Sequence, residues 1–150
     1  MKSTEKLDLG NMKPEPGVFL IEASAGTGKT YSIANLYLHF ILQEKKIREI
    51  LVVTFTEAAT KELRNRIREN LSVALHILAD SKNAKIDPTV LKILDSYEVD
   101  DKYQLLENAI INFDQAQWPH MVILYDDGSC WLSGCYISLS GVLMMSADHM

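Results

Sequence analysis

Residues 18–30 read Val-Phe-Leu-Ile-Glu-Ala-Ser-Ala-Gly-Thr-Gly-Lys-Thr, and this stretch decides the expected fold. Its second part fits the phosphate-loop pattern G-x-x-x-x-G-K-[ST], except that Ala23 replaces the first glycine. The two glycines allow backbone angles at which main-chain N–H groups close around phosphate oxygens. Lys29 would bring a positive charge to the β- and γ-phosphates, and the Thr30 hydroxyl would ligate Mg²⁺. The pattern therefore predicts a nucleoside triphosphate site; the alternative is a glycine-rich turn.

The segments around this loop have the pattern of a parallel α/β unit. Short continuous apolar runs at Val18–Ile21 and Ile50–Val53 predict two buried strands. Between them, residues 30–42 are apolar nearly all round, which predicts a buried helix. Helical spacing of apolar residues over 57–78 predicts a second helix, with Thr56 as its N-cap. Strand, helix, strand and helix in this order predict an α/β fold with a parallel sheet.

Composition excludes several classes of protein. With 150 residues, 47% hydrophobic and 23% charged, the chain is neither disordered nor larger than one domain or two small ones. The sequence contains no run of 18 apolar residues and no apolar signal core, so we expect a cytoplasmic chain with no membrane span. A net charge of −5 argues against a generally basic surface for nucleic acid, but it leaves room for a local basic stripe.

The end of the second predicted strand is a candidate nucleic-acid site. Thr54, Phe55 and Thr56 follow that strand, at the carboxyl edge where open α/β sheets bind their ligands. The next helix has basic residues on one stripe, at Lys61, Arg64 and Arg68. An aromatic platform between hydroxyls, beside positive charge, suits single-stranded nucleic acid. A core phenylalanine and a solvated helix face would give the same pattern.

Residues 20–30 and 51–67 together closely resemble the RecB family, the beta subunits of exodeoxyribonuclease V. This family belongs to the UvrD-like branch of superfamily-one DNA helicases. The first stretch matches the family's ATP-binding motif, and the second, Leu-Val-Val-Thr-Phe-Thr-Glu-Ala-Ala-Thr-Lys-Glu-Leu-Arg-Asn-Arg-Ile, matches its motif Ia, which touches single-stranded DNA. The resemblance runs from about residue 7 to 116. It implies nucleotide contacts at Ala23, Ser24, Ala25, Gly26, Thr27, Gly28, Lys29 and Thr30, and DNA contacts at Thr54, Phe55, Thr56 and Arg64.

The resemblance also implies a function. The family unwinds duplex DNA with ATP and Mg²⁺, degrades DNA as an exonuclease, and acts in double-strand break repair and recombination. Its partners are single-stranded DNA, duplex ends, and RecC-like and RecD-like subunits. A chain of 150 residues is too short for two motor lobes and a nuclease, so we expect an ATP-binding N-terminal fragment of a P-loop (RecA-like) motor lobe. The alternatives are a small P-loop phosphotransferase and an inactive truncated product.

The resemblance sets the expected domains. These are a leader at 1–17, the first part of the ATP-binding lobe at 18–80, the start of a helical inserted subdomain at 81–116, and an atypical tail at 117–150. Weaker helical patterns fall at 89–97 and 101–115, and all 15 Lys and Arg residues lie at or before Lys102. We expect a shifted reading frame from about Gln117; the alternative is an ordinary divergent tail. Within the tail, the run ending at Asp126 and Asp127 and the pair Cys130 and Cys135 give only weak signals for magnesium or zinc.

Overall fold

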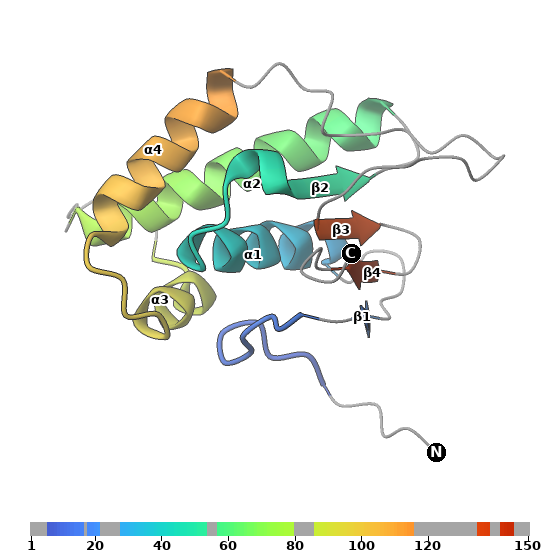
Figure 1. Ribbon diagram of the computed structural model, residues 1–150, viewed down its shortest axis with the longest axis horizontal. Coiled ribbons are helices and arrows are strands. Elements are labelled where there is room, and N and C mark those ends of the chain that lie inside the picture. Colours follow the sequence, from blue (N-terminus) through green and yellow to red (C-terminus); the bar gives the residue numbers. More distant parts are fainter. Residues whose placement is uncertain are drawn as a thin grey trace, which may run out of the picture.

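The computed structural model describes most of the first 115 residues and two short strands near the C-terminus (Figure 1). The described ranges are 6–16, 18–21, 28–53, 57–79, 86–115, 135–138 and 142–145. The elements are β1 (Val18–Ile21), α1 (Lys29–Leu42), the 3-10 turn η1 (Ile47–Glu49), β2 (Ile50–Val53), α2 (Glu57–Leu78), α3 (Pro88–Asp95), α4 (Lys102–Gln115), β3 (Cys135–Ser138) and β4 (Val142–Met145).

The local elements match the sequence prediction closely. Strands β1 and β2 and helix α2 have the predicted bounds, and α1 begins one residue earlier than predicted. Helices α3 and α4 match the two weaker helical patterns, with ends that differ from the prediction by at most two residues. Among the described residues, no helix is both long enough and apolar enough to cross a membrane.

The predicted parallel sheet, and with it the expected P-loop (RecA-like) α/β fold, is wrong. The strand order is β1-β4-β3-β2, so β1 and β2 are not neighbours. Only β2 and β3 pair in parallel, whereas β4 is antiparallel to both β1 and β3. The sheet is therefore mixed, and helices make up most of the described chain. Apolar runs identify strands one at a time, but hydrogen-bonding partners come from distant segments, here from residues 135–145, where we predicted no sheet strands.

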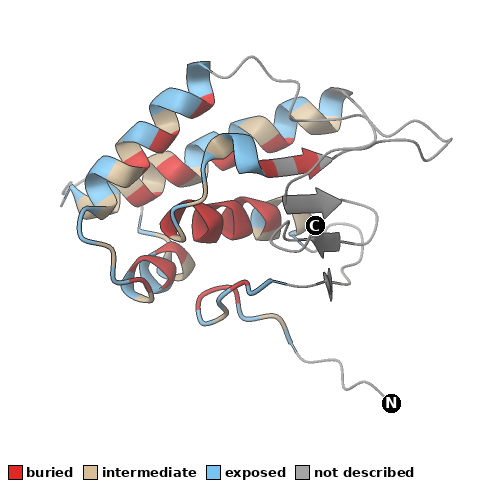
Figure 2. Cartoon of the chain, in the orientation of Figure 1, coloured by how far each residue is buried: buried red, intermediate tan, exposed pale blue. Residues whose placement is uncertain are grey.

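Helix α1 forms the centre of the packing, which explains why its sequence is apolar on every side. It contacts α2, α3 and α4, and Figure 2 shows it buried along nearly its whole length. The core around it also takes side chains from α2, such as Leu63, Ile67 and Leu71, all with no exposed surface. Helix α4 packs through Leu106 and Phe113 and leaves its opposite face exposed.

Two polar side chains of α1, Asn35 and His39, are fully buried, and His39 ties the N-terminal segment to the helices. Its Nε2 lies 2.8 Å from the Leu9 carbonyl oxygen, and its Nδ1 lies 2.8 Å from the Tyr97 hydroxyl. Because a carbonyl only accepts, Nε2 carries the proton and donates, and Nδ1 accepts from Tyr97. One turn later, Gln43 donates to the Pro14 carbonyl at 2.7 Å. Residues 6–16 are thus fixed alongside α1, on the side away from α2 in Figure 1.

A bidentate ion pair joins α4 to α2. Arg68 Nε donates to Asp114 Oδ1 at 2.7 Å, and Nη2 donates to Oδ2 at 2.8 Å. The Arg68 guanidinium lowers the pKa of the Asp114 carboxyl, first through these hydrogen bonds and then through its charge. Both side chains are about half exposed, so solvent screens the pair and it adds little to stability. The ion pair orients α4, and the buried apolar side chains hold it in place.

Candidate functional site

Three residues of the predicted phosphate loop lie within the described structure: Gly28, Lys29 and Thr30. Gly28 is the N-cap of α1 and has φ 85° and ψ 26°, a left-handed conformation that side chains disfavour. A Cβ added there would meet the Tyr31 Cβ at 3.9 Å, an ordinary contact. The backbone angle, and not lack of space, therefore favours glycine at this position. The turn places Lys29 and Thr30 in the first turn of α1.

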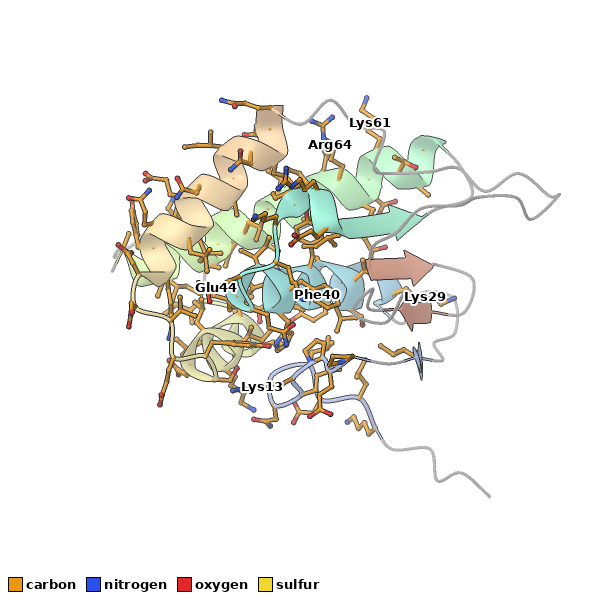
Figure 3. All side chains as sticks on the ribbon, in the orientation of Figure 1. Lys13, Lys29, Phe40, Glu44, Lys61 and Arg64 are labelled. Carbon is orange, nitrogen blue, oxygen red and sulfur yellow. The ribbon has the colours of Figure 1, made fainter. Side chains whose placement is uncertain are left out.

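The N-terminus of α1 has the properties of an anion site. Its described N-cap residue, Gly28, provides no side-chain cap, and its first turn contains no acidic residue. The Ser32 amide donates to the Gly28 carbonyl at 2.8 Å, so the amides ahead of Ser32 precede the regular helical hydrogen bonds. Those amides and the helix dipole favour a negative charge. In Figure 3, Lys29 lies at the end of α1 beside the strands, and β2 runs toward this same end of the molecule.

A cavity of about 740 Å³ opens beside this helix end. Its walls come from the first turns of α1, one face of α2 and the start of α3, and Thr30 is part of its lining. The Tyr31 hydroxyl donates to both carboxylate oxygens of Asp87, at 3.1 and 3.0 Å. Burial is the main cause of the raised pKa of Tyr31. The described polar residues that line the cavity are Thr30, Tyr31, Glu62, Arg66, Glu69, Asn70, Asp87 and Thr89.

Sequence reasoning missed Tyr31 and Asp87 as part of this region. Asp87 is the N-cap of α3, and it accepts hydrogen bonds from the amides of Thr89 and Val90 at 2.8 and 3.4 Å. An Asp followed by Pro at the first helical position is a sequence signal for a helix start, so this cap could have been found. The bond from Tyr31 to that cap joins elements more than fifty residues apart, and no local pattern reports it.

The predicted DNA-contacting residues are only partly described. Thr54, Phe55 and Thr56 lie outside the described residues. Arg64 is half-buried on α2, and its charge helps to lower the pKa of Asp114. Figure 3 shows Lys61 and Arg64 projecting from the same side of α2, away from α1. Arg68, the third member of the basic stripe, is bound to Asp114 of α4.

Other predicted residues also lie outside the described part of the chain. They are Ala23, Ser24, Ala25, Gly26 and Thr27 of the loop, and Asp126, Asp127 and Cys130 of the tail. Cys135 begins β3, where the backbone alone is described. Over the described ranges, no group of three or more His, Cys, Asp or Glu residues is placed to hold a metal ion.

Comparison with known proteins identifies the family. The model for the UvrD/REP helicase N-terminal domain matches residues 8–124, so the chain belongs to this family of helicase domains. Within it, the chain is similar to RecBCD enzyme subunit RecB. It is 42% identical to RecB of Buchnera aphidicola subsp. Schizaphis graminum over 113 residues, which cover 69% of the chain. Identity is 39% over 113 residues with Haemophilus influenzae RecB (66% of the chain) and 45% over 100 residues with Escherichia coli RecB (61%).

The similarity covers one end of much longer proteins. The chain spans 9% of the length of the Buchnera and Haemophilus relatives and 8% of the Escherichia coli relative. The predicted resemblance to the N-terminal part of RecB is therefore confirmed. Family membership identifies a helicase N-terminal domain, which is a small part of the full-length relatives.

Proposed function

We propose that this chain is the ATP-binding N-terminal part of a RecB-like helicase subunit, with Mg²⁺ and triphosphate bound at residues 23–30. The observation that supports it best is the start of α1. Left-handed Gly28 leads into a helix whose first turn holds Lys29 and Thr30 and contains no acidic residue. These residues fit a triphosphate with Mg²⁺. Backbone amides and the Lys29 ammonium can donate to phosphate oxygens, and the Thr30 hydroxyl oxygen can ligate Mg²⁺.

Each residue has a distinct role in the proposed site. Gly28 lets the backbone turn so that amide groups point at the phosphates, and Lys29 adds a charge-assisted contact. The Thr30 hydroxyl would hold Mg²⁺, which when bound supplies positive charge that neutralises the phosphate oxygens. Because the chain spans about a tenth of its relatives, we assign it nucleotide binding and assign the complete hydrolysis cycle to the longer proteins.

Replacing Lys29 by alanine tests this proposal. We expect Lys29→Ala to weaken Mg·ATP binding roughly 10- to 100-fold, the value of a hydrogen bond to a charged group. Calorimetric titration of the 150-residue chain measures this, with Lys92→Ala on the exposed face of α3 as the control. Equal or negligible binding by parent and Lys29→Ala would contradict the proposal and favour an inactive product. Transfer of phosphate to a small acceptor would instead favour a phosphotransferase.

We also propose single-stranded DNA as a ligand of the connection between β2 and α2. This connection comprises Thr54, Phe55 and Thr56, since β2 ends at Val53 and α2 begins at Glu57. Support comes from Lys61 and Arg64, which project together from the first half of α2 and would meet the phosphate backbone.

A stacking role for Phe55 predicts a measurable loss. We expect Phe55→Ala to weaken binding of a fluorescent single-stranded oligonucleotide by roughly 1–3 kcal/mol, the value of one stacked base. Fluorescence anisotropy at fixed salt is the measurement. Tyr103→Ala is the matched control, because Tyr103 is an aromatic side chain 43% exposed on α4, away from the basic stripe. An affinity unchanged by Phe55→Ala would remove this residue from the DNA site.

The name of the relatives suggests the wider role. They are subunits of a RecBCD enzyme, and we extend to this chain a part in the repair and recombination of double-strand breaks. In that setting duplex ends are the substrate, exonuclease activity belongs to the full-length subunit, and RecC-like and RecD-like subunits are the partners. Co-purification of the chain with those subunits tests the assembly, and its failure at micromolar concentrations would oppose it.

A further inference from the structure

A second cavity lies at the opposite end of α1 from Gly28. It has a volume of about 580 Å³ and is bounded by the last turn of α1, residues 44–48 and one face of α4. Helix α1 has 14 residues, which places this cavity about 20 Å from the predicted phosphate site. We call it the α1–α4 groove. Of the residues predicted to contact nucleotide or DNA, those that the structure describes (Gly28, Lys29, Thr30 and Arg64) are not part of its lining.

The α1–α4 groove has an apolar base and a polar rim. Ile41 and Ala109 are buried, and Leu105 is partly buried against the same core. The rim on the α4 side presents three amide side chains at helical spacing, Asn108, Asn112 and Gln115, all of them exposed.

Positive charge dominates the other side of the groove. Lys45, Lys46 and Arg48 line it within four residues, and Glu44 is the single carboxylate among the described lining residues. Lys46 and Arg48 are exposed, so their charged groups remain hydrated and available to an anionic ligand. Lysine, arginine and amide donors facing one another across a groove are suited to carboxylates.

The backbone that presents these cations is held in an uncommon conformation. Glu44 has φ 61°, the left-handed region, where a residue with a Cβ is disfavoured by roughly 1–2 kcal/mol. Its amide donates to the Ile41 carbonyl at 2.9 Å, and the Lys45 amide donates to the Phe40 carbonyl at 3.0 Å. This closed turn ends α1 and directs residues 45–48 along α4. Figure 3 shows Glu44 at that end of α1.

We propose that the α1–α4 groove binds an acidic peptide segment whose apolar side chain enters the groove. The cations and amides bind its carboxylates, and the base formed by Ile41, Leu105 and Ala109 buries the apolar side chain. A nucleic-acid backbone has no apolar group for this base, so the lining favours a peptide over DNA. The site is independent of nucleotide binding, and the partner is a protein segment rich in Asp and Glu around a Leu or Ile.

The test uses the whole 150-residue chain and a fluorescein-labelled peptide, Gly-Asp-Glu-Leu-Glu-Asp-Gly. We expect the neutral analogue Gly-Asn-Gln-Leu-Gln-Asn-Gly to bind at least about tenfold more weakly. Lys46→Glu and Arg48→Glu should each weaken binding of the acidic peptide about tenfold. Lys6→Glu makes the same charge change outside the groove, and it should leave affinity within about twofold.

Further variants distinguish binding in the α1–α4 groove from general attraction between the peptide and the charged protein surface. Glu44→Gln removes the one carboxylate of the lining and should tighten binding about twofold, and replacing the peptide's Leu by Gly should weaken it several-fold. If Lys46→Glu changes the circular dichroism spectrum, Lys46→Gln replaces it as the test variant, because it removes the positive charge without adding a negative one. Equal losses from Lys6→Glu and Lys46→Glu, or equal binding of the acidic and neutral peptides, would overturn the proposal. Displacement of the peptide by short duplex DNA, with the same dependence on Lys46, would replace it with a nucleic-acid site.

Discussion

Replacing Phe113 by alanine is expected to lower the free energy of unfolding by about 3–5 kcal/mol. The Phe113 side chain has no exposed surface, and its ring meets the Tyr37 ring edge-on, with centroids 5.8 Å apart at 85°. Its removal would leave a cavity between α4 and the central helix α1, because the rigid helices around it relax only partly. Urea denaturation followed by circular dichroism gives the measurement.

The face of α4 opposite Phe113 provides the control. Ile111 is 47% exposed, so Ile111→Ala should change the free energy of unfolding by no more than about 0.5 kcal/mol. Where Phe113→Ala fails to fold, Phe113→Leu retains most of the volume and should cost about 1 kcal/mol. A loss below 1 kcal/mol for Phe113→Ala would mean that α4 does not pack against α1 as described.

Replacing His39 by alanine is expected to cost about 3 kcal/mol of unfolding free energy. The change removes a fully buried ring, and with it the donor to the Leu9 carbonyl and the acceptor of the Tyr97 hydroxyl, which keeps its 3.4 Å bond from Gln43. His39→Gln keeps an amide donor near Leu9 and should cost less than His39→Ala. Equal stability of His39→Ala and the parent in urea denaturation would show that the N-terminal segment is not bound through this ring.

The same histidine gives a signature in the pH dependence of stability. Burial lowers the pKa of His39 below its ordinary value of 6.5, and the nearby charge of Lys13 lowers it further. Below about pH 6.5 the unfolded chain therefore takes up a proton that the folded protein resists, and stability falls as the pH decreases toward the folded pKa. Burial raises the pKa of the partner Tyr97 to about 12, so that hydroxyl stays neutral in this range.

Comparison with His39→Gln isolates the contribution of His39 to the pH dependence of stability, because carboxylate titrations contribute equally to both proteins. The unfolding free energy of the parent should fall more steeply than that of His39→Gln as the pH is lowered from about 6.5. Parallel curves over this range would mean that His39 is protonated as readily in the folded state as in the unfolded state.

Sequence patterns predicted the elements better than their arrangement. Continuous apolar runs and helical spacing placed β1, β2, α1 and α2 to within one residue, because each of these signals is local. The parallel sheet was wrong because strand order is a long-range property, and β3 and β4 lie between β1 and β2 in the sheet. No local pattern in Val18–Ile21 specifies that its partner is Val142–Met145.

The candidate site was likewise predictable where its signals are local and not where it depends on contacts between distant segments. The glycine pattern identified Gly28, whose left-handed backbone is a local requirement, and the nucleotide contacts assigned around it stay a prediction. The cavity beside it depends on Tyr31 meeting Asp87, and the α1–α4 groove depends on the angle at which α4 crosses α1. Arg68 also fitted the basic stripe by spacing, yet its guanidinium is bound to Asp114, a partner from another helix.

The carbonyls of Leu9 and Pro14, which accept from His39 and Gln43, set where this folding unit begins. A shortened chain that starts at β1 would retain every predicted motif and still lose both acceptors, leaving the His39 Nε2–H without its partner and Gln43 Nε2 with its 3.4 Å bond to the Tyr97 hydroxyl. Residues 7–16 are therefore best kept in any shortened form of the chain. Engineered truncations or fused partners are best placed ahead of them.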